Sequence, residues 1–371
     1  MGTYFYSTIF IYTLTFISLY FSCLLAKNKR NWKYALIGIA IYAIIFGCRY
    51  GVGVDFFAYL TNYEQARNLM LSNNINHEAG FSFIMTTLAN LNLHPAFFFG
   101  LIAFLQLFLI FSSVRKDIWI YTYLAFTFVI GCVWLNFSNG LRQELAFCIF
   151  ALALSYTDKK QIYAHYALIL LAISMHTSAF LMVIFFPILL YSQEWFKNEK
   201  IQLVILAIAF IFGQSGIFEN YLSVFETLLE FDTYTNYDTY LRYEDKLYSE
   251  VSIGLGFYIT LLINFITVAF SSKAKKMLNN KNFTIMYNFY FIGTILRYAF
   301  LQSHLIQRVN YYFYGFHFII TAYIIYYLYK NKMQKTLLLM ISLYLLTFIA
   351  TMLKMEGNTA MFRFYWDIIQ Y

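Results

Sequence analysis

The sequence predicts an all-α protein, a polytopic integral membrane bundle of about 11 to 14 transmembrane helices. Of its residues, 61% are hydrophobic and only 12% are charged, about half of the roughly 25% charged that is typical of soluble domains. Apolar runs near the ~20 residues needed to cross a bilayer recur from end to end. No long polar stretch separates these runs, so we expect residues 1–371 to form a single transmembrane domain with no soluble module.

Each apolar run is expected to be helical, because unpaired backbone groups cannot be left in hydrocarbon. The first run, Thr3 to Ala26, is too long for a typical signal-peptide core and has no basic region before it, so we expect it to be retained. The run 80–114 is long for one crossing and short for two, and His94-Pro95 interrupts it, which predicts a half-span followed by a full span. The candidate spans are 4–25, 32–48, 80–114, 118–135, 141–156, 161–174, 176–191, 201–215, 251–271, 283–301, 309–329 and 336–353.

Lys and Arg in the short connections predict the orientation of the chain. One alternating set of connections carries 17 of the 26 basic residues with four acidic ones, so this face is expected to be cytoplasmic. The other set is net acidic, includes a loop at 216–250, and is expected to face outward. The net charge of +8 is therefore a topology signal and gives no support for nucleic-acid binding. The basic connections are 27–33, 115–117, 158–160, 194–200, 273–281 and 330–335.

Polar residues from distant parts of the chain collect on the predicted outer face. The segment Arg49-Tyr50-Gly51-Val52-Gly53-Val54-Asp55 places an arginine where a span meets water, then two glycines that free the backbone, then a carboxylate. Such a segment is suited to an anionic ligand. The convergence of several corners predicts an active site facing the cell exterior or the periplasm. The other polar corners are 136–144, 176–178, 216–250 and 302–308.

Arginines on this face predict a phosphate-binding site. Their planar forks match phosphate oxygens, and an arginine near hydrocarbon is costly unless it has a partner or a function. A single arginine of this kind can simply extend to the lipid headgroups, but four together favour a site. The four are Arg49, Arg142, Arg297 and Arg308.

His176 and Asp55 are the candidate proton acceptors, in that order of preference, since both residue types work as general bases. A histidine at a helix boundary is also a common polar cap, so that alternative stays open. The outer acids lack the regular spacing of a divalent-cation site, and the four cysteines lack metal-ligand spacing. We therefore expect no metal and no cofactor.

In order along the chain, these segments resemble the EpsG/Wzy-type bacterial polysaccharide polymerases. The resemblance covers most of residues 30–330, but the family usually has Thr where this chain has Val54, and nothing in 216–250 can be matched. The matching pieces are 49–55 with Tyr59, Asn139-Gly140-Leu141-Arg142-Gln143 with Lys159-Lys160, 171–178 with His176, and Arg308 with Tyr311-Tyr312.

The resemblance implies the multi-helix architecture of lipid-sugar-dependent (GT-C-like) glycosyltransferases. It also implies polymerisation of undecaprenyl-diphosphate-linked oligosaccharide repeat units into O-antigen or exopolysaccharide, on the outer face of the bacterial inner membrane. Donor and acceptor would both be lipid-linked, with a chain-length regulator as a further partner. The expected catalytic residues are His176, Asp55, Arg142 and Arg308. The expected substrate-binding residues are Arg49, Tyr59, Asn139, Gln143, Arg297, Tyr311 and Tyr312.

Three other functions compete with polymerisation. An O-antigen ligase uses the same donor, but it typically carries its essential residues in one large outer loop. A flippase for lipid-linked glycan would need cationic residues lining a central cavity, and the midplane here is nearly free of charge. A membrane acyltransferase would need a histidine within a span, and His165 and His317 lack a companion motif.

Overall fold

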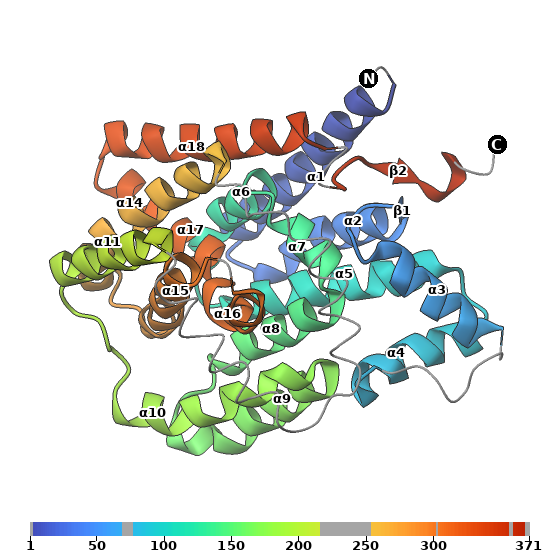
Figure 1. The fold of residues 1–371 in the computed structure, drawn as a ribbon, viewed down its shortest axis with the longest axis horizontal. Coiled ribbons are helices and arrows are strands. Elements are labelled where there is room, and N and C mark those ends of the chain that lie inside the picture. Colours follow the sequence, from blue (N-terminus) through green and yellow to red (C-terminus); the bar gives the residue numbers. More distant parts are fainter. Residues whose placement is uncertain (1–2, 69–76, 216–253, 302, 356–358, 368–371) are drawn as a thin grey trace.

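The computed structural model describes residues 3–68, 77–215, 254–301, 303–355 and 359–367, and helices make up 82% of them (Figure 1). The predicted all-α class is therefore confirmed. The predicted outer loop 216–250 lies outside the described residues.

The first half of the chain builds a layer of packed helices around α5. Helix α2 packs against both α1 and α5, α5 packs against α8, and α1 packs against α6 (Figure 1). A short 3-10 turn at Trp32–Tyr34 precedes α2. The helices are α1 (Thr3–Asn28), α2 (Ala35–Gly47), α3 (Phe56–Arg67), α4 (Ala79–Asn90), α5 (Pro95–Ser113), α6 (Tyr121–Ile130), α7 (Val133–Asn139) and α8 (Leu141–Ala153).

The second half packs α15 between α11 and α16, and α17 against α6. A 3-10 helix, η4, continues the chain after α9. The elements are α9 (Ile162–Met175), η4 (Thr177–Ile184), α10 (Phe185–Tyr191), α11 (Glu199–Ser215), α14 (Leu255–Leu278), α15 (Lys281–Ala299), α16 (His304–Tyr314), α17 (His317–Lys330) and α18 (Gln334–Leu353).

The break predicted at His94-Pro95 is confirmed. Helix α4 ends at Asn90, and α5 begins at Pro95, where the missing N–H of proline costs no helical hydrogen bond. The His94 side chain caps α5 by accepting a hydrogen bond from the backbone N–H of Ala96 at 3.2 Å. The run 80–114 is thus a short helix followed by a long one.

All twelve candidate spans are occupied by helices, but many of these helices are short. Among the described residues, α1, α5, α14 and α18 are long and apolar enough to cross a bilayer, and α6 with α7 makes a fifth if the 66° bend between them lies within one span. Outward-facing apolar side chains on α18, such as Leu338 and Leu353, are 66% and 70% exposed, which fits contact with lipid. The protein is a helical membrane protein.

The C-terminal segment returns to the end of α2, a pairing that the sequence did not predict. Strand β2 (Arg363–Phe364) pairs antiparallel with β1 (Arg49–Tyr50), and the Tyr12 hydroxyl donates to the backbone oxygen of Ala360 at 2.6 Å. Helix α1 therefore holds the C-terminal segment, and that segment in turn holds the turn after α2 (Figure 1).

Candidate active site

Arg49 anchors the turn that follows α2. Its side chain is 1% exposed and donates three hydrogen bonds to backbone oxygens, to Phe46 at 2.6 Å, Val52 at 3.3 Å and Ser138 at 3.4 Å. Its guanidinium also lies 4.8 Å from the ring centroid of Phe99. Buried polar groups need such partners. The contacts of Arg49 are thus with the protein itself, and they fix the turn 49–55.

Two glycines let this turn dock on the corner between α7 and α8. Gly51 and Gly53 have φ of 71° and 99°, values that other residues rarely adopt. A Cβ at Gly53 would lie 2.8 Å from Asn139 Oδ1 and from the Ser138 backbone oxygen. Asn139 Oδ1 instead accepts a hydrogen bond from the Val54 N–H at 2.6 Å. The docked turn carries Asp55 to the first turn of α8.

Glu78 joins two of the predicted catalytic residues. Its Oε2 accepts a hydrogen bond from Arg142 Nη1 at 2.8 Å, and its Oε1 lies 3.6 Å from His176 Nδ1. Oε1 also accepts from the Thr177 backbone N–H at 3.1 Å and from its hydroxyl at 3.0 Å. One carboxylate therefore holds the starts of α4, α8 and η4 together.

Helix packing places Glu78 in this position. Helix α4 packs against α3 and against α9, the helix that ends beside His176. The approach to α9 is so close that a Cβ at Gly80 would overlap the side chains of Ser174 and Met175. The small residue lets the start of α4 lie against the end of α9, which brings the Glu78 carboxylate to Thr177.

Arg142 is held on one side by Glu78 and on the other by Tyr59. Tyr59 lies on α3, is 6% exposed, and accepts a hydrogen bond from Arg142. Arg142 Nε is buried and has no hydrogen-bond partner among the described residues. The guanidinium is thus fixed in place and still has donor capacity left.

His176 stands in extended backbone, at φ −156° and ψ 124°, between α9 and η4. Its Nδ1 accepts from the Ser178 backbone N–H at 3.3 Å and lies 3.0 Å from the Ser178 hydroxyl. That hydroxyl also donates to the Tyr312 hydroxyl on α16 at 3.1 Å. In this arrangement Nδ1 faces the protein, and Nε2 is the ring nitrogen left for a ligand.

The charges of this cluster act on one another. Partial burial lowers the pKa of His176, the charges of Arg142 and Arg308 lower it further, and the Glu78 carboxylate opposes them. Partial burial raises the pKa of Asp55 above its usual value, against the lowering effect of the same two arginines. Burial would also raise the pKa of Glu78, but its hydrogen bonds and the charge of Arg142 prevail and lower it.

Helix α16 brings the remaining predicted residues to the same corner. Gln143 Nε2 donates to the backbone oxygen of Arg308, which joins α8 to α16, and Arg308 is exposed close to Asp55 and His176. Tyr312 is fully buried and reaches His176 through Ser178. Tyr311 lies one position before it on the same helix.

Arg297 is set apart from this cluster. Its guanidinium lies 4.7 Å from the ring centroid of Tyr314, and Tyr298 and Tyr311 also lie close to it. Like Arg49, it is engaged by the protein's own groups, here by the aromatic rings of α16 and its own helix.

The described residues contain no group of three or more His, Cys, Asp or Glu side chains that could hold a metal ion. The cluster formed by Asp55, Tyr59, Glu78, Arg142 and His176, with Arg308 beside it, offers instead fixed cations next to proton acceptors. Such a pairing can bind an anionic leaving group and deprotonate a hydroxyl.

A family model for the EpsG family matches residues 32–366, nearly the whole chain. The chain belongs to the EpsG family. The resemblance expected from the sequence is thus confirmed, and membership indicates a membrane-bound protein with a polysaccharide polymerase role. No curated protein and no solved structure matches the chain.

Two acidic residues of this EpsG-family chain were not among the predicted site residues. Glu78 is the last charged residue before the apolar run 80–114, and so has the same kind of position as Arg49 and His176. That position was the signal that could have found it. Glu144 lies in the first turn of α8, two residues after Arg142, and is 3% exposed.

Proposed function

We propose that this EpsG-family protein polymerises lipid-linked oligosaccharide repeat units by glycosyl transfer, with a lipid diphosphate as leaving group. The observation that carries this proposal is the Glu78 carboxylate, which holds Arg142 at 2.8 Å and lies 3.6 Å from His176. A diphosphate-binding cation and a proton acceptor are thereby positioned together. They lie at the ends of apolar helices, where a lipid-borne substrate presents its head.

The proposed donor is a growing glycan on undecaprenyl diphosphate, and the acceptor is a hydroxyl of a second lipid-linked repeat unit. The acceptor oxygen attacks the anomeric carbon of the donor, and the bond from that carbon to the diphosphate oxygen breaks. The diphosphate leaves with the bonding electron pair. Arg142 and Arg308 neutralise the charge that develops on it, an electrostatic contribution often worth several kcal/mol.

His176 takes the proton of the acceptor hydroxyl at Nε2. This role needs the tautomer with hydrogen on Nδ1, in which Nδ1 gives up the bond from the Ser178 backbone N–H at 3.3 Å and donates instead to the Ser178 hydroxyl at 3.0 Å, facing Glu78. Nε2 then has its lone pair free. Glu78 then stabilises the imidazolium, as the third group does in other base-assisted sites. Asp55, exposed and near both arginines, is the alternative base.

His176→Ala is expected to lower turnover at saturating substrate by about 10²–10⁴-fold, the usual contribution of a general base, with donor binding little changed. The rate of the native protein should fall as pH drops through the His176 pKa, which burial and the two arginines hold below the ~6.5 of a free imidazole. A protonated imidazole has no lone pair to take the proton of the hydroxyl, so the rate is lost on the acid side. The measurement is kcat against pH.

His94→Gln is the matched control for His176→Gln, since His94 caps α5 through Nδ1 as His176 caps η4. Both variants keep a capping oxygen, and only the change at His176 should be inactive. If His176→Gln retains most activity and the native pH profile, capping is the whole role of His176. Asp55→Asn should then be the inactive variant.

The proposed location is the bacterial inner membrane, with the cluster facing outward. A cysteine at the exposed position Asn136, near the cluster, should be labelled from outside by an impermeant thiol reagent. A cysteine at the exposed position Asn331, after α17, should be labelled only after permeabilisation. Both variants need the four native cysteines replaced by alanine. The reverse labelling pattern would place the cluster in the cytoplasm.

Deletion in the host separates this proposal from ligation. Loss of a polymerase should leave glycan caps of a single repeat unit, whereas loss of a ligase should remove all capping. A chain-length regulator, the further partner expected from the resemblance, would act on the length of the polymer and leave its formation intact.

A further inference from the structure

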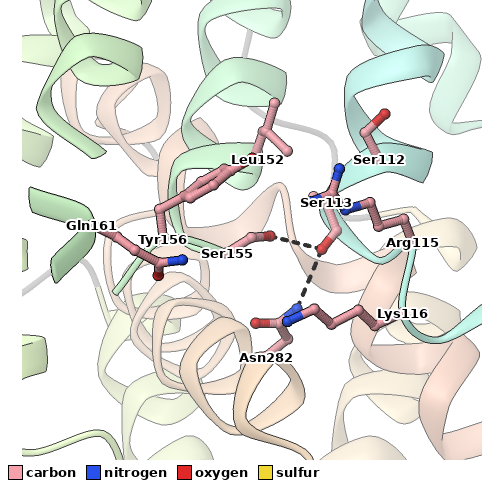
Figure 2. A pocket seen from close by; sticks show the side chains of 9 residues that line it. All are labelled: Ser112, Ser113, Arg115, Lys116, Leu152, Ser155, Tyr156, Gln161 and Asn282. Carbon is pink, nitrogen blue, oxygen red and sulfur yellow. Dashed lines mark hydrogen bonds between the residues drawn. The ribbon is translucent and has the colours of Figure 1, made fainter. Parts of the chain in front are cut away.

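A polar pocket lies at the opposite end of α8 from Arg142. It opens where the end of α5, the loop after it, the end of α8 and the start of α15 meet (Figure 2). Its volume is about 370 Å³ including the open mouth. The residues that matter for its chemistry are Ser112, Arg115, Lys116, Ser155, Gln161 and Asn282.

The floor of the pocket is built by side chains that bind a single carbonyl. The Ser155 hydroxyl donates to the Ser113 backbone oxygen at 2.9 Å, and Asn282 Nδ2 donates to the same oxygen at 3.4 Å (Figure 2). These two bonds tie α8 and α15 to the end of α5. The pocket is therefore a feature of the helix packing, with its walls fixed by three helices.

Positive charge at the rim has no ionic partner in the part of the chain that the structure describes. Arg115 and Lys116 are exposed, and neither forms an ion pair there. The two nearby carboxylates are engaged elsewhere: Asp117 is buried and accepts from Asn280 and Tyr323, and Asp158 pairs with Lys281. The mouth of the pocket thus presents two cations that form no close ion pair, although the charge of Lys116 also acts on Asp117 and Asp158.

Two buried polar atoms of pocket-lining residues also have no hydrogen-bond partner among the described residues. Ser112 is 7% exposed, and its Oγ is one of these buried atoms. The other is Oε1 of Gln161. Buried polar atoms without partners are rare in folded proteins and call for an explanation. The hydroxyl can donate or accept, while Oε1 can only accept, so a ligand that completes this site must bring a hydrogen-bond donor, for which a hydroxyl is suitable.

We propose that this pocket binds a phosphate ester that carries a free hydroxyl, the chemistry of a glycerol phosphate headgroup. Arg115 and Lys116 hold the phosphate oxygens, and Gln161 accepts from the ligand hydroxyl. Taken alone, the basic residues in the loop after α5 would serve only to orient the chain in the membrane. Walls fixed by three helices and two buried atoms without partners among the described residues distinguish a binding site from that simpler role.

The pocket lies at a helix end, so the ligand source is expected to be an anionic phospholipid of the leaflet opposite the Arg142 cluster. The test uses the purified full chain in detergent with added phosphatidylglycerol or phosphatidylcholine, and native mass spectrometry reports the bound lipid. Phosphatidylglycerol should bind at least tenfold more tightly than phosphatidylcholine.

Arg115→Gln with Lys116→Gln should weaken phosphatidylglycerol binding about tenfold or more, since each basic residue near a lipid surface contributes measurably. Lys159→Gln with Lys160→Gln is the matched control. These lysines are exposed on the neighbouring turn, carry the same charge, and do not line the pocket. The control pair should change binding less than threefold. An equal loss in both pairs, or equal binding of the two lipids, overturns the proposal.

Gln161→Leu tests the contact with the ligand hydroxyl separately. Phosphatidic acid has no glycerol hydroxyl in its headgroup, so the variant should bind it as the native protein does and should prefer phosphatidylglycerol less strongly. An unaltered preference contradicts the role of Gln161.

A competition experiment with free glycerol 3-phosphate distinguishes a lipid ligand from a soluble one. Displacement of the lipid at millimolar concentration supports the same site with a soluble ligand, and failure to displace supports a lipid ligand. None of these readouts depends on polymerase activity.

Discussion

Arg142→Ala is expected to abolish polymer formation, with turnover lowered by about 10²–10³-fold, the typical cost of removing one group that stabilises developing negative charge. The guanidinium is held at its place in the cluster by Glu78 at 2.8 Å and by Tyr59. The variant should still insert and accumulate in the membrane. The measurement is polymer length and amount on a gel, at matched protein levels.

Arg142→Lys should recover only part of this activity, because an ammonium keeps the charge and loses the planar fork. Arg67→Ala is the matched control, since Arg67 on α3 pairs with Glu64 at 2.6 Å, outside the cluster that holds Arg142. Arg308→Ala should resemble Arg142→Ala. Full-length polymer at the native rate from Arg142→Lys and Arg308→Lys would show that charge alone suffices and that bidentate binding has no role.

Glu78→Gln is expected to lower turnover by about tenfold or more. The substitution keeps the shape of the side chain and removes its charge. The amide oxygen can still accept from Thr177, but the charge that faces Arg142 and His176 is lost. Because the Glu78 carboxylate raises the pKa of His176, its removal should move the acid limb of the pH profile to lower pH. The measurement is kcat against pH for both proteins.

A purely structural role for Glu78 would reduce the amount of active protein and leave the pH profile where it is. Glu64→Gln, a surface carboxylate on α3, is the control and should change neither quantity. Combining Glu78→Gln with Arg142→Ala should cost little more than Arg142→Ala alone, since residues in one network are not additive. Additive losses would show that the two side chains act independently.

The helical framework was predictable because hydropathy and backbone chemistry act locally. The apolar runs became helices, and the break at His94-Pro95 appeared where proline cannot continue a preceding helix. The break at His176 followed in the same way from a polar residue between two apolar stretches. Such patterns do not predict the length of each helix. Many predicted spans are short or bent helices, because tertiary packing decides where each helix ends.

The long-range contacts of the site were not predictable from the pattern. Arg49 and Arg142 look alike in the sequence, yet Arg49 is saturated by three backbone oxygens, whereas Arg142 pairs with a carboxylate 64 residues earlier in the chain. The strand that ties Arg49 to Phe364 depends on two segments more than 300 residues apart. Glu78 has a telling position at the edge of an apolar run, but its importance lies in its contacts with Arg142, His176 and Thr177, far along the chain.

One measurement tests the proposed function most directly: purified protein is supplied with undecaprenyl-diphosphate-linked repeat units, and the products are separated on a gel. The proposed mechanism predicts a ladder spaced by one repeat unit, with one undecaprenyl diphosphate released for each bond formed, and no ladder from Arg142→Ala. A protein that leaves the repeat units unjoined, yet transfers them to a different acceptor or moves them unchanged across a membrane, would contradict it.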